Sequence, residues 1–128
     1  MAWVDVVLAA VLLEYLFFIG LVGRARGRYG IEAPATSGHP VFERWLRVQG
    51  NTLELLVVFV PALWLAARYW NPLYAAVLGV VFFVGRALYA ISYVRDPKTR
   101  GLGFVLSLLP TAVLVLAALV GALRGAAA

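Results

Sequence analysis

The chain of 128 residues contains no cysteine, a single histidine and only 13% charged residues. Without cysteine there is no disulfide, no cysteine-held iron–sulfur cluster and no thiol nucleophile from the protein itself. His39 lies in the stretch SGHP with no second ligand near it, whereas a metal site needs three or four converging ligands. Neither a glycine-rich phosphate loop nor a Ser/His/Asp set is visible. We therefore expect no bound metal and no nucleophile of the chain's own.

Apolar residues are abundant instead. They make up 64% of the chain, and the mean hydropathy is +0.94. A soluble domain of this size could not bury so much apolar surface. A membrane-spanning helix needs ~20 mostly apolar residues to cross a ~30 Å hydrocarbon core. We therefore expect one all-α integral membrane domain over residues 1–128, a bundle of four transmembrane helices at about 2–23, 42–70, 72–95 and 101–124.

The net charge of +5 could indicate a nucleic-acid partner, but the distribution of the basic residues favours a membrane topology. They gather around the first and third expected connections, at Arg24, Arg26, Arg28, Arg44, Arg47, Arg95, Lys98 and Arg100. Loops rich in Lys and Arg stay in the cytoplasm. We expect these two connections to be cytoplasmic, both termini to lie on the other side, and the basic residues also to contact lipid headgroups.

A polar face opens the second expected helix, in the stretch FERWLRVQGNTLE over residues 42–54. Arg44, Arg47, Asn51 and Glu54 are spaced so that they share one helical face. A charge near the bilayer centre costs at least ~2.5–3.5 kcal/mol, so such residues usually serve a function. This face is the first indication of a binding site.

The third expected helix carries a matching face with Arg86, Tyr89 and Tyr93. Glu54 and Arg86 lie at similar depths below the same end of the bundle, so we expect them to form an ion pair, which could be purely structural. The two faces together would form a pocket of arginines, phenols, an amide and a carboxylate. Such a pocket suits a small anionic or zwitterionic ligand, because arginine holds carboxylates in a bidentate fork.

Two stretches resemble signatures of a known family. FERWLRVQGNTLE resembles the second-helix signature of the MAPEG family, the membrane-associated proteins in eicosanoid and glutathione metabolism. GRALYAISYVRDPKTR is similar to the signature that joins the third and fourth helices of that family. The resemblance extends from about Arg24 to Phe104. The spacing from Tyr93 to Arg100 is that of the leukotriene C4 synthase and microsomal glutathione transferase branch, and the composition is compatible with a bacterial member.

The resemblance implies a homotrimer that binds its co-substrate glutathione between adjacent subunits near the cytoplasmic face. The implied enzyme is a glutathione transferase or peroxidase in the bacterial inner membrane, acting on a lipophilic electrophile or hydroperoxide. Arg100 is the implied catalytic residue, which stabilises the glutathione thiolate. The implied glutathione ligands are Arg26, Arg47, Gln49, Asn51, Glu54, Tyr89 and Tyr93.

Two other functions remain open at this point. The chain could be a non-catalytic MAPEG-like scaffold that binds lipid, although the presence of Arg47, Asn51, Glu54, Tyr93 and Arg100 argues against it. It could also be a small multidrug transporter, since such proteins have four short helices and an essential glutamate in the first, where Glu14 lies. A transporter of that kind would not need buried charges on two further helices, so we favour the glutathione enzyme.

Overall fold

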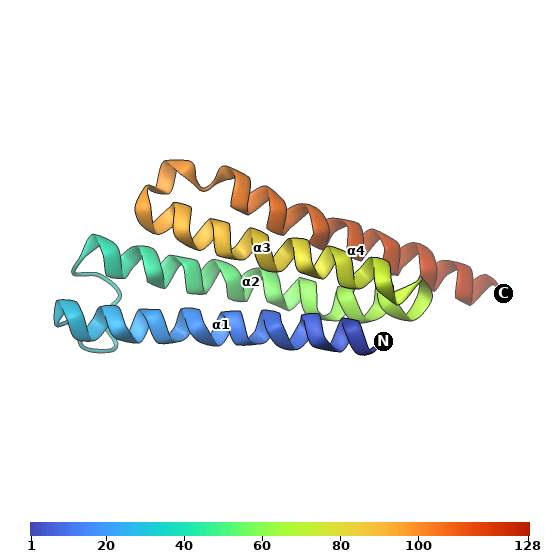
Figure 1. The fold of residues 1–128 in the computed structure, drawn as a ribbon, viewed down its shortest axis with the longest axis horizontal. Coiled ribbons are helices and arrows are strands. Elements are labelled where there is room, and N and C mark those ends of the chain that lie inside the picture. The colour runs from blue at the N-terminus through green and yellow to red at the C-terminus, as the bar shows by residue number, and fades with distance from the viewer.

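The computed structural model describes all residues from 1 to 128 and consists of four long helices packed side by side (Figure 1). They are α1 (Ala2–Tyr29), α2 (Pro40–Tyr69), α3 (Pro72–Arg95) and α4 (Gly101–Ala127), and a short 3-10 turn, η1 (Pro97–Thr99), precedes α4. Consecutive helices run in opposite directions, so both termini lie at the same end of the bundle (Figure 1). All four helices are long and apolar enough to cross a membrane.

The first helix is longer than expected. It continues beyond residue 23 to Tyr29 and ends where Gly30 adopts a left-handed backbone with φ of 66°. Arginine is a good helix former, and a cation in the last turn interacts favourably with the helix dipole, so Arg26 and Arg28 extend the helix beyond its apolar part. The connection to α2 is correspondingly shorter and covers residues 30–39.

Side chains fix the starts of the next elements. The Nδ1 atom of His39 accepts a hydrogen bond from the Val41 amide at 3.1 Å, and its ring stacks on Tyr29. Asn71 accepts from the Leu73 amide at the start of α3, and Asp96 accepts from the Lys98 amide at η1. In each case a side chain satisfies an amide that has no partner within its helix. His39 thus has a structural role as a helix cap.

Helices α3 and α4 approach each other closely because glycines face the contact. A methyl group on Gly103 would collide with the backbone of Tyr89, and one on Gly85 would lie 2.7 Å from the backbone of Leu106. Small residues of this kind let helices pack backbone to backbone inside a membrane. The contact fixes the start of α4 against the last turns of α3.

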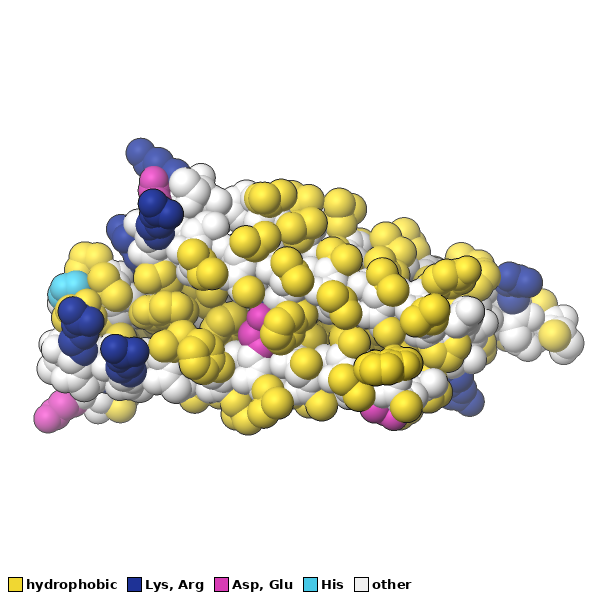
Figure 2. All heavy atoms as spheres, viewed as in Figure 1, with side chains coloured by type: hydrophobic (Ala, Val, Ile, Leu, Met, Phe, Trp, Pro, Cys, Tyr) yellow, Lys and Arg dark blue, Asp and Glu magenta, His cyan; other side chains and the backbone are white.

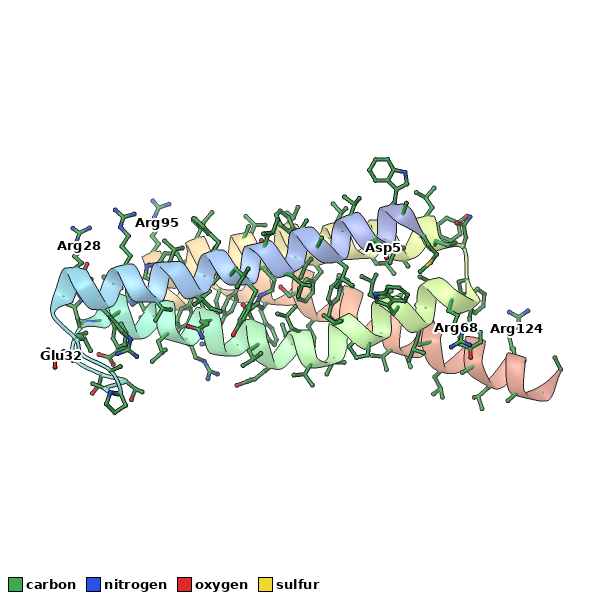
Figure 3. The ribbon with its side chains drawn as sticks, turned by 90° about the horizontal axis from the view of Figure 1, so that it is seen from below. Asp5, Arg28, Glu32, Arg68, Arg95 and Arg124 are labelled. Atoms are coloured by element: carbon green, nitrogen blue, oxygen red, sulfur yellow. The ribbon has the colours of Figure 1, made fainter.

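Most of the surface is apolar. Only 31 of the 128 residues are buried, and hydrophobic side chains cover the middle of the face shown in Figure 2. Exposing this apolar surface to water would cost much free energy, so lipid tails or further copies of the chain must cover it. Charged side chains gather at the two ends. Arg28 and Arg95 lie at one end, which we call the basic end, and Asp5, Arg68 and Arg124 lie at the other (Figure 3).

Candidate functional site

A small polar cavity of about 230 Å³ is present towards the basic end. Five residues line it, namely Arg47, Asn51, Tyr89, Arg100 and Phe104. Arg47 and Asn51 are one turn apart on α2, Tyr89 comes from the last two turns of α3, and Arg100 directly precedes α4. Three elements therefore bring two guanidinium groups, an amide and a phenol together around one space.

Aromatic packing positions the α3 wall of this cavity. Tyr89 is buried, and its ring stacks on the ring of Tyr93 with 5.5 Å between centroids. Phe104 lies 6.5 Å from Tyr89 in a tilted arrangement. Both distances are within the range of favourable aromatic pairs. The close approach of Gly103 to the Tyr89 backbone is what places Phe104 and Arg100 beside this pair.

Arg86 lies behind the cavity and is fully buried. Its Nη2 atom donates to Asn51 Oδ1 at 2.9 Å and to Thr52 Oγ1 at 2.8 Å, and its Nε atom donates to the same hydroxyl at 3.1 Å. Its guanidinium carbon also lies over the Tyr89 ring, 4.2 Å from the centroid. The expected partner, Glu54, is absent from this set.

The expected ion pair between Arg86 and Glu54 is therefore not formed within the chain. Glu54 lies on the exposed side of α2, whereas Arg86 points into the bundle and contacts Asn51 and Thr52. Depth alone suggested the pair, but residues at one depth can point in different directions around their helix axes.

The expected polar face of α2 also divides into two. Arg44 donates to the Val94 carbonyl at 2.9 Å and to the Arg95 carbonyl at 3.5 Å, at the C-terminal end of α3. An arginine in this position satisfies carbonyls that have no partner within the helix and interacts favourably with the helix dipole. Arg44 is thus a structural cap for α3, and Arg47 and Asn51 line the cavity.

Four of the expected glutathione ligands do not line this cavity. Arg26 donates to the Ala35 carbonyl at 2.8 Å and lies over the Phe42 ring, so it orders the connection between α1 and α2. Gln49 does not line the cavity, and Glu54 is exposed on α2. Tyr93 is connected to the cavity through its stacking on Tyr89. Within one chain, the structure brings together Arg47, Asn51, Tyr89 and Arg100.

Two residues of this region were not among the expected site residues. Phe104 lines the cavity and Thr52 holds Arg86. Thr52 is next to Asn51, and a hydroxyl beside an intramembrane amide could have indicated a buried hydrogen-bond acceptor. The signal for Phe104 is its place one helical turn after Arg100.

The charge of the cavity determines what it can bind. Arg47 and Arg100 are its charged groups, and no carboxylate lines it. An anion entering this space would be attracted by both guanidinium groups, and lipid around the bundle would weaken screening by solvent. The arrangement is chemically suited to hold carboxylates and to stabilise a further negative charge beside them.

Comparison with known proteins shows similarity over nearly the whole chain. The MAPEG family model matches residues 4–120. An uncharacterized protein of Synechocystis sp. is 46% identical over 121 residues, which cover 94% of this chain and 88% of that protein. Microsomal glutathione S-transferase 2 of Homo sapiens is 40% identical over 96% of this chain and 84% of its own length. Leukotriene C4 synthase of Cavia porcellus is 36% identical over 74% of this chain and 63% of its own length.

Proposed function

The chain belongs to the MAPEG family and is a multi-pass integral membrane protein, and on that basis we propose that it is a glutathione-dependent enzyme of the membrane. In this proposal the enzyme binds glutathione near the basic end, stabilises its thiolate and transfers it to a lipophilic electrophile or uses it to reduce a lipid hydroperoxide. The relatives named as a glutathione transferase and as leukotriene C4 synthase support the proposal.

The observation that carries the proposal is the cavity lined by Arg47, Asn51, Tyr89 and Arg100. Glutathione has two carboxylates, two peptide groups and one thiol. The Arg47 guanidinium can hold a carboxylate in a two-pronged hydrogen bond, and the Asn51 amide and Tyr89 phenol can bond to the polar backbone of the peptide. Arg100 is the second cation of the cavity and is left to act on the thiol.

Stabilising the thiolate is the task we assign to Arg100. A free thiol has a pKa near ~8.5, so only a few per cent is ionised at neutral pH. A guanidinium ~4 Å from the sulfur, at an effective dielectric constant of ~20, offers ~4 kcal/mol before desolvation is subtracted. This is enough to make the thiolate the dominant bound form. The enzyme then needs no cysteine of its own, in agreement with the composition.

The two reactions share this thiolate. In conjugation, the sulfur has lost its proton to solvent and forms a bond to an electrophilic carbon as the bond from that carbon to a halide or an epoxide oxygen breaks. A halide leaves as the anion, and an alkoxide takes up a proton from solvent. In peroxide reduction, the sulfur attacks the O–O bond and gives a sulfenic acid and an alcohol, and a second glutathione then yields the disulfide and water. Either acceptor is lipophilic and would reach the site from the bilayer, along the apolar surface of the bundle.

We assign the remaining ligands to the assembled protein. Arg26, Gln49 and Glu54 do not reach the cavity of their own chain, so in this proposal they act across the contact between subunits of a homotrimer. Glu54 is exposed within an apolar span, where lipid could not solvate its carboxylate. A second copy of the chain could offer that carboxylate polar partners. The basic end then faces the cytoplasm of a bacterial cell, and both termini lie across the inner membrane.

Ultraviolet absorbance of the thiolate tests this function. We expect purified protein mixed with glutathione at neutral pH to show a thiolate signal that is lost in Arg100→Ala. The matched control is Arg95→Ala, because Arg95 is an exposed arginine at the same end and does not line the cavity. If the wild-type protein gives no thiolate signal and calorimetry detects no glutathione binding, the enzyme proposal is wrong and a lipid-binding scaffold is the better hypothesis.

A further inference from the structure

The fully buried guanidinium of Arg86 is connected to both sides of the proposed site. It donates to Asn51 on α2 and lies over the ring of Tyr89 on its own helix. It does not itself line the cavity. Arg86 can therefore affect the site only through the side chains of Asn51 and Tyr89.

The hydrogen bond from Arg86 also fixes how Asn51 faces the cavity. A guanidinium can only donate, so the carbonyl oxygen of the Asn51 amide must point towards Arg86, and the NH₂ group is left to donate elsewhere. A donor at this position suits a carboxylate or peptide carbonyl of the bound ligand. If Arg86 did not hold it, the amide could rotate and present an acceptor instead.

One hydrogen-bonding atom of Arg86 remains without a partner. Its Nη1 atom is buried and donates to no group. The one other buried side-chain atom without a hydrogen bond is Glu14 Oε1, on α1. The two orphaned atoms are complementary, a donor and an acceptor, and Glu14 lines a cavity together with Phe83, Ala87 and Ala90, which lie within one turn of Arg86 on α3. An unsatisfied buried polar group is costly, and two that lie close together can satisfy each other directly or through one water molecule.

Glu14 is the acidic residue best placed to balance the charge of Arg86. It lines an apolar cavity of about 490 Å³ between α1, α2 and α3, where the other ten residues are hydrophobic and none is a cation. Asp5 and Glu54 are exposed, and Glu54 does not bond to Arg86. A buried arginine needs a counter-charge, and the structure offers this one.

We propose that Arg86 is a positioning residue that orients Asn51 and Tyr89 for glutathione, and that Glu14 of α1 is its counter-charge. This inference rests on the proposed function. It connects three helices into one unit: Glu14 of α1 holds Arg86 of α3, Arg86 and Thr52 hold each other, and Asn51 of α2 takes its orientation from Arg86. A helix that does not line the cavity thereby affects glutathione binding.

Thr52 offers the mildest test, because replacing Arg86 itself could prevent folding. Thr52→Val keeps the shape of the side chain and removes the hydroxyl that accepts two hydrogen bonds from Arg86. We expect glutathione affinity, measured by calorimetry, to fall about five- to tenfold because the guanidinium loses its anchor. Thr52→Ser keeps the hydroxyl and should restore the affinity. A merely structural role would lower the thermal midpoint of unfolding and leave the affinity unchanged, which would overturn the proposal.

Glu14→Gln tests the counter-charge, with Asp5→Asn as the matched control. Both changes neutralise a carboxylate on α1, but Asp5 is exposed at the opposite end of the bundle (Figure 3). We expect Glu14→Gln to weaken glutathione binding and to reduce the bound thiolate fraction, and Asp5→Asn to change neither. Equal binding by the wild-type protein and Glu14→Gln would refute the role of Glu14. Failure of the wild-type protein to bind glutathione would instead refute the proposed function, and this inference with it.

Discussion

Arg44 and Arg47 are one turn apart on α2, yet their surroundings give them different tasks. Arg44 donates to carbonyls at the end of α3, whereas Arg47 lines the polar cavity. The spacing of the two residues predicted a shared face, and only the position of α3 decides which of them is used as a cap. The same holds for Arg86, whose partners are Thr52 and Asn51 because of how α2 and α3 are rotated against each other.

This pair of arginines gives the first prediction. Arg47→Ala should weaken glutathione binding about 10- to 100-fold, because a charge-assisted hydrogen bond contributes ~1.5–3 kcal/mol. The thermal stability of the variant should change little, since the Arg47 side chain is exposed and forms no hydrogen bond within the chain. Calorimetry with glutathione measures the affinity.

Arg44→Ala is the internal control and should behave in the opposite way. It removes the cap of α3 and should lower the midpoint of thermal unfolding, with a much smaller loss of glutathione affinity. If both variants lost affinity equally, the division of the polar face into a cap and a ligand would be wrong.

At the scale of the helices, the sequence predicted where α3 and η1 begin more reliably than where α1 ends. Asn71-Pro72 and Asp96-Pro97 are local signals, since the side chain accepts a backbone hydrogen bond and proline suits the first helical turn. Hydropathy, in contrast, indicates where the lipid ends and not where the helix ends. Gly30 is the residue that stops α1, and the apolar run ends several residues earlier.

The packing of α4 against α3 gives the second prediction. Gly103→Ala should destabilise the protein by about 1–3 kcal/mol, because the added methyl would collide with the Tyr89 backbone and α4 would have to shift. Phe104 and Arg100 would move with it, so the thiolate signal should fall as well. Thermal unfolding and thiolate absorbance of the same sample measure the two effects.

Gly101→Ala serves as the control, two residues away on the same helix. Nothing lies within 4 Å of a methyl group there, and alanine favours a helix more than glycine does. We expect unchanged or slightly raised stability. If Gly101→Ala lost as much stability as Gly103→Ala, the close contact with the Tyr89 backbone would not be the reason that residue 103 must be glycine.

At the scale of the whole molecule, the orientation in the membrane is open to a direct experiment. The chain has no cysteine, so a single introduced cysteine can be labelled without background. Thr36→Cys lies in the connection between α1 and α2, at the basic end, and Ala128→Cys lies at the C-terminus. With a membrane-impermeant maleimide on intact bacteria, we expect labelling of residue 128 alone. Labelling of residue 36 alone would reverse the proposed topology.

The sequence could suggest an assembly only through family resemblance, because one chain contains no partner. The structure adds a physical reason for one. Glu54 is exposed in an apolar span, surrounded on its helix by exposed Leu53, Val57 and Val58. Arg26 and Gln49, two expected ligands, do not line the cavity of their own chain. A neighbouring subunit would cover Glu54 and could bring these ligands to the site.

This reasoning gives the last prediction. Native mass spectrometry of the detergent-extracted protein should give a mass three times the 13.9 kDa of one chain. Glu54→Gln should weaken the assembly or glutathione binding, because it removes a charge that lipid cannot solvate and that only a neighbouring subunit or the ligand can satisfy. Asp5→Asn, a neutralisation at the opposite end, should leave the mass and the affinity unchanged. A trimer with unaltered mass and affinity in Glu54→Gln would show that Glu54 serves neither the assembly nor the ligand, and a monomeric wild-type protein that still binds glutathione would show that one chain forms the complete site.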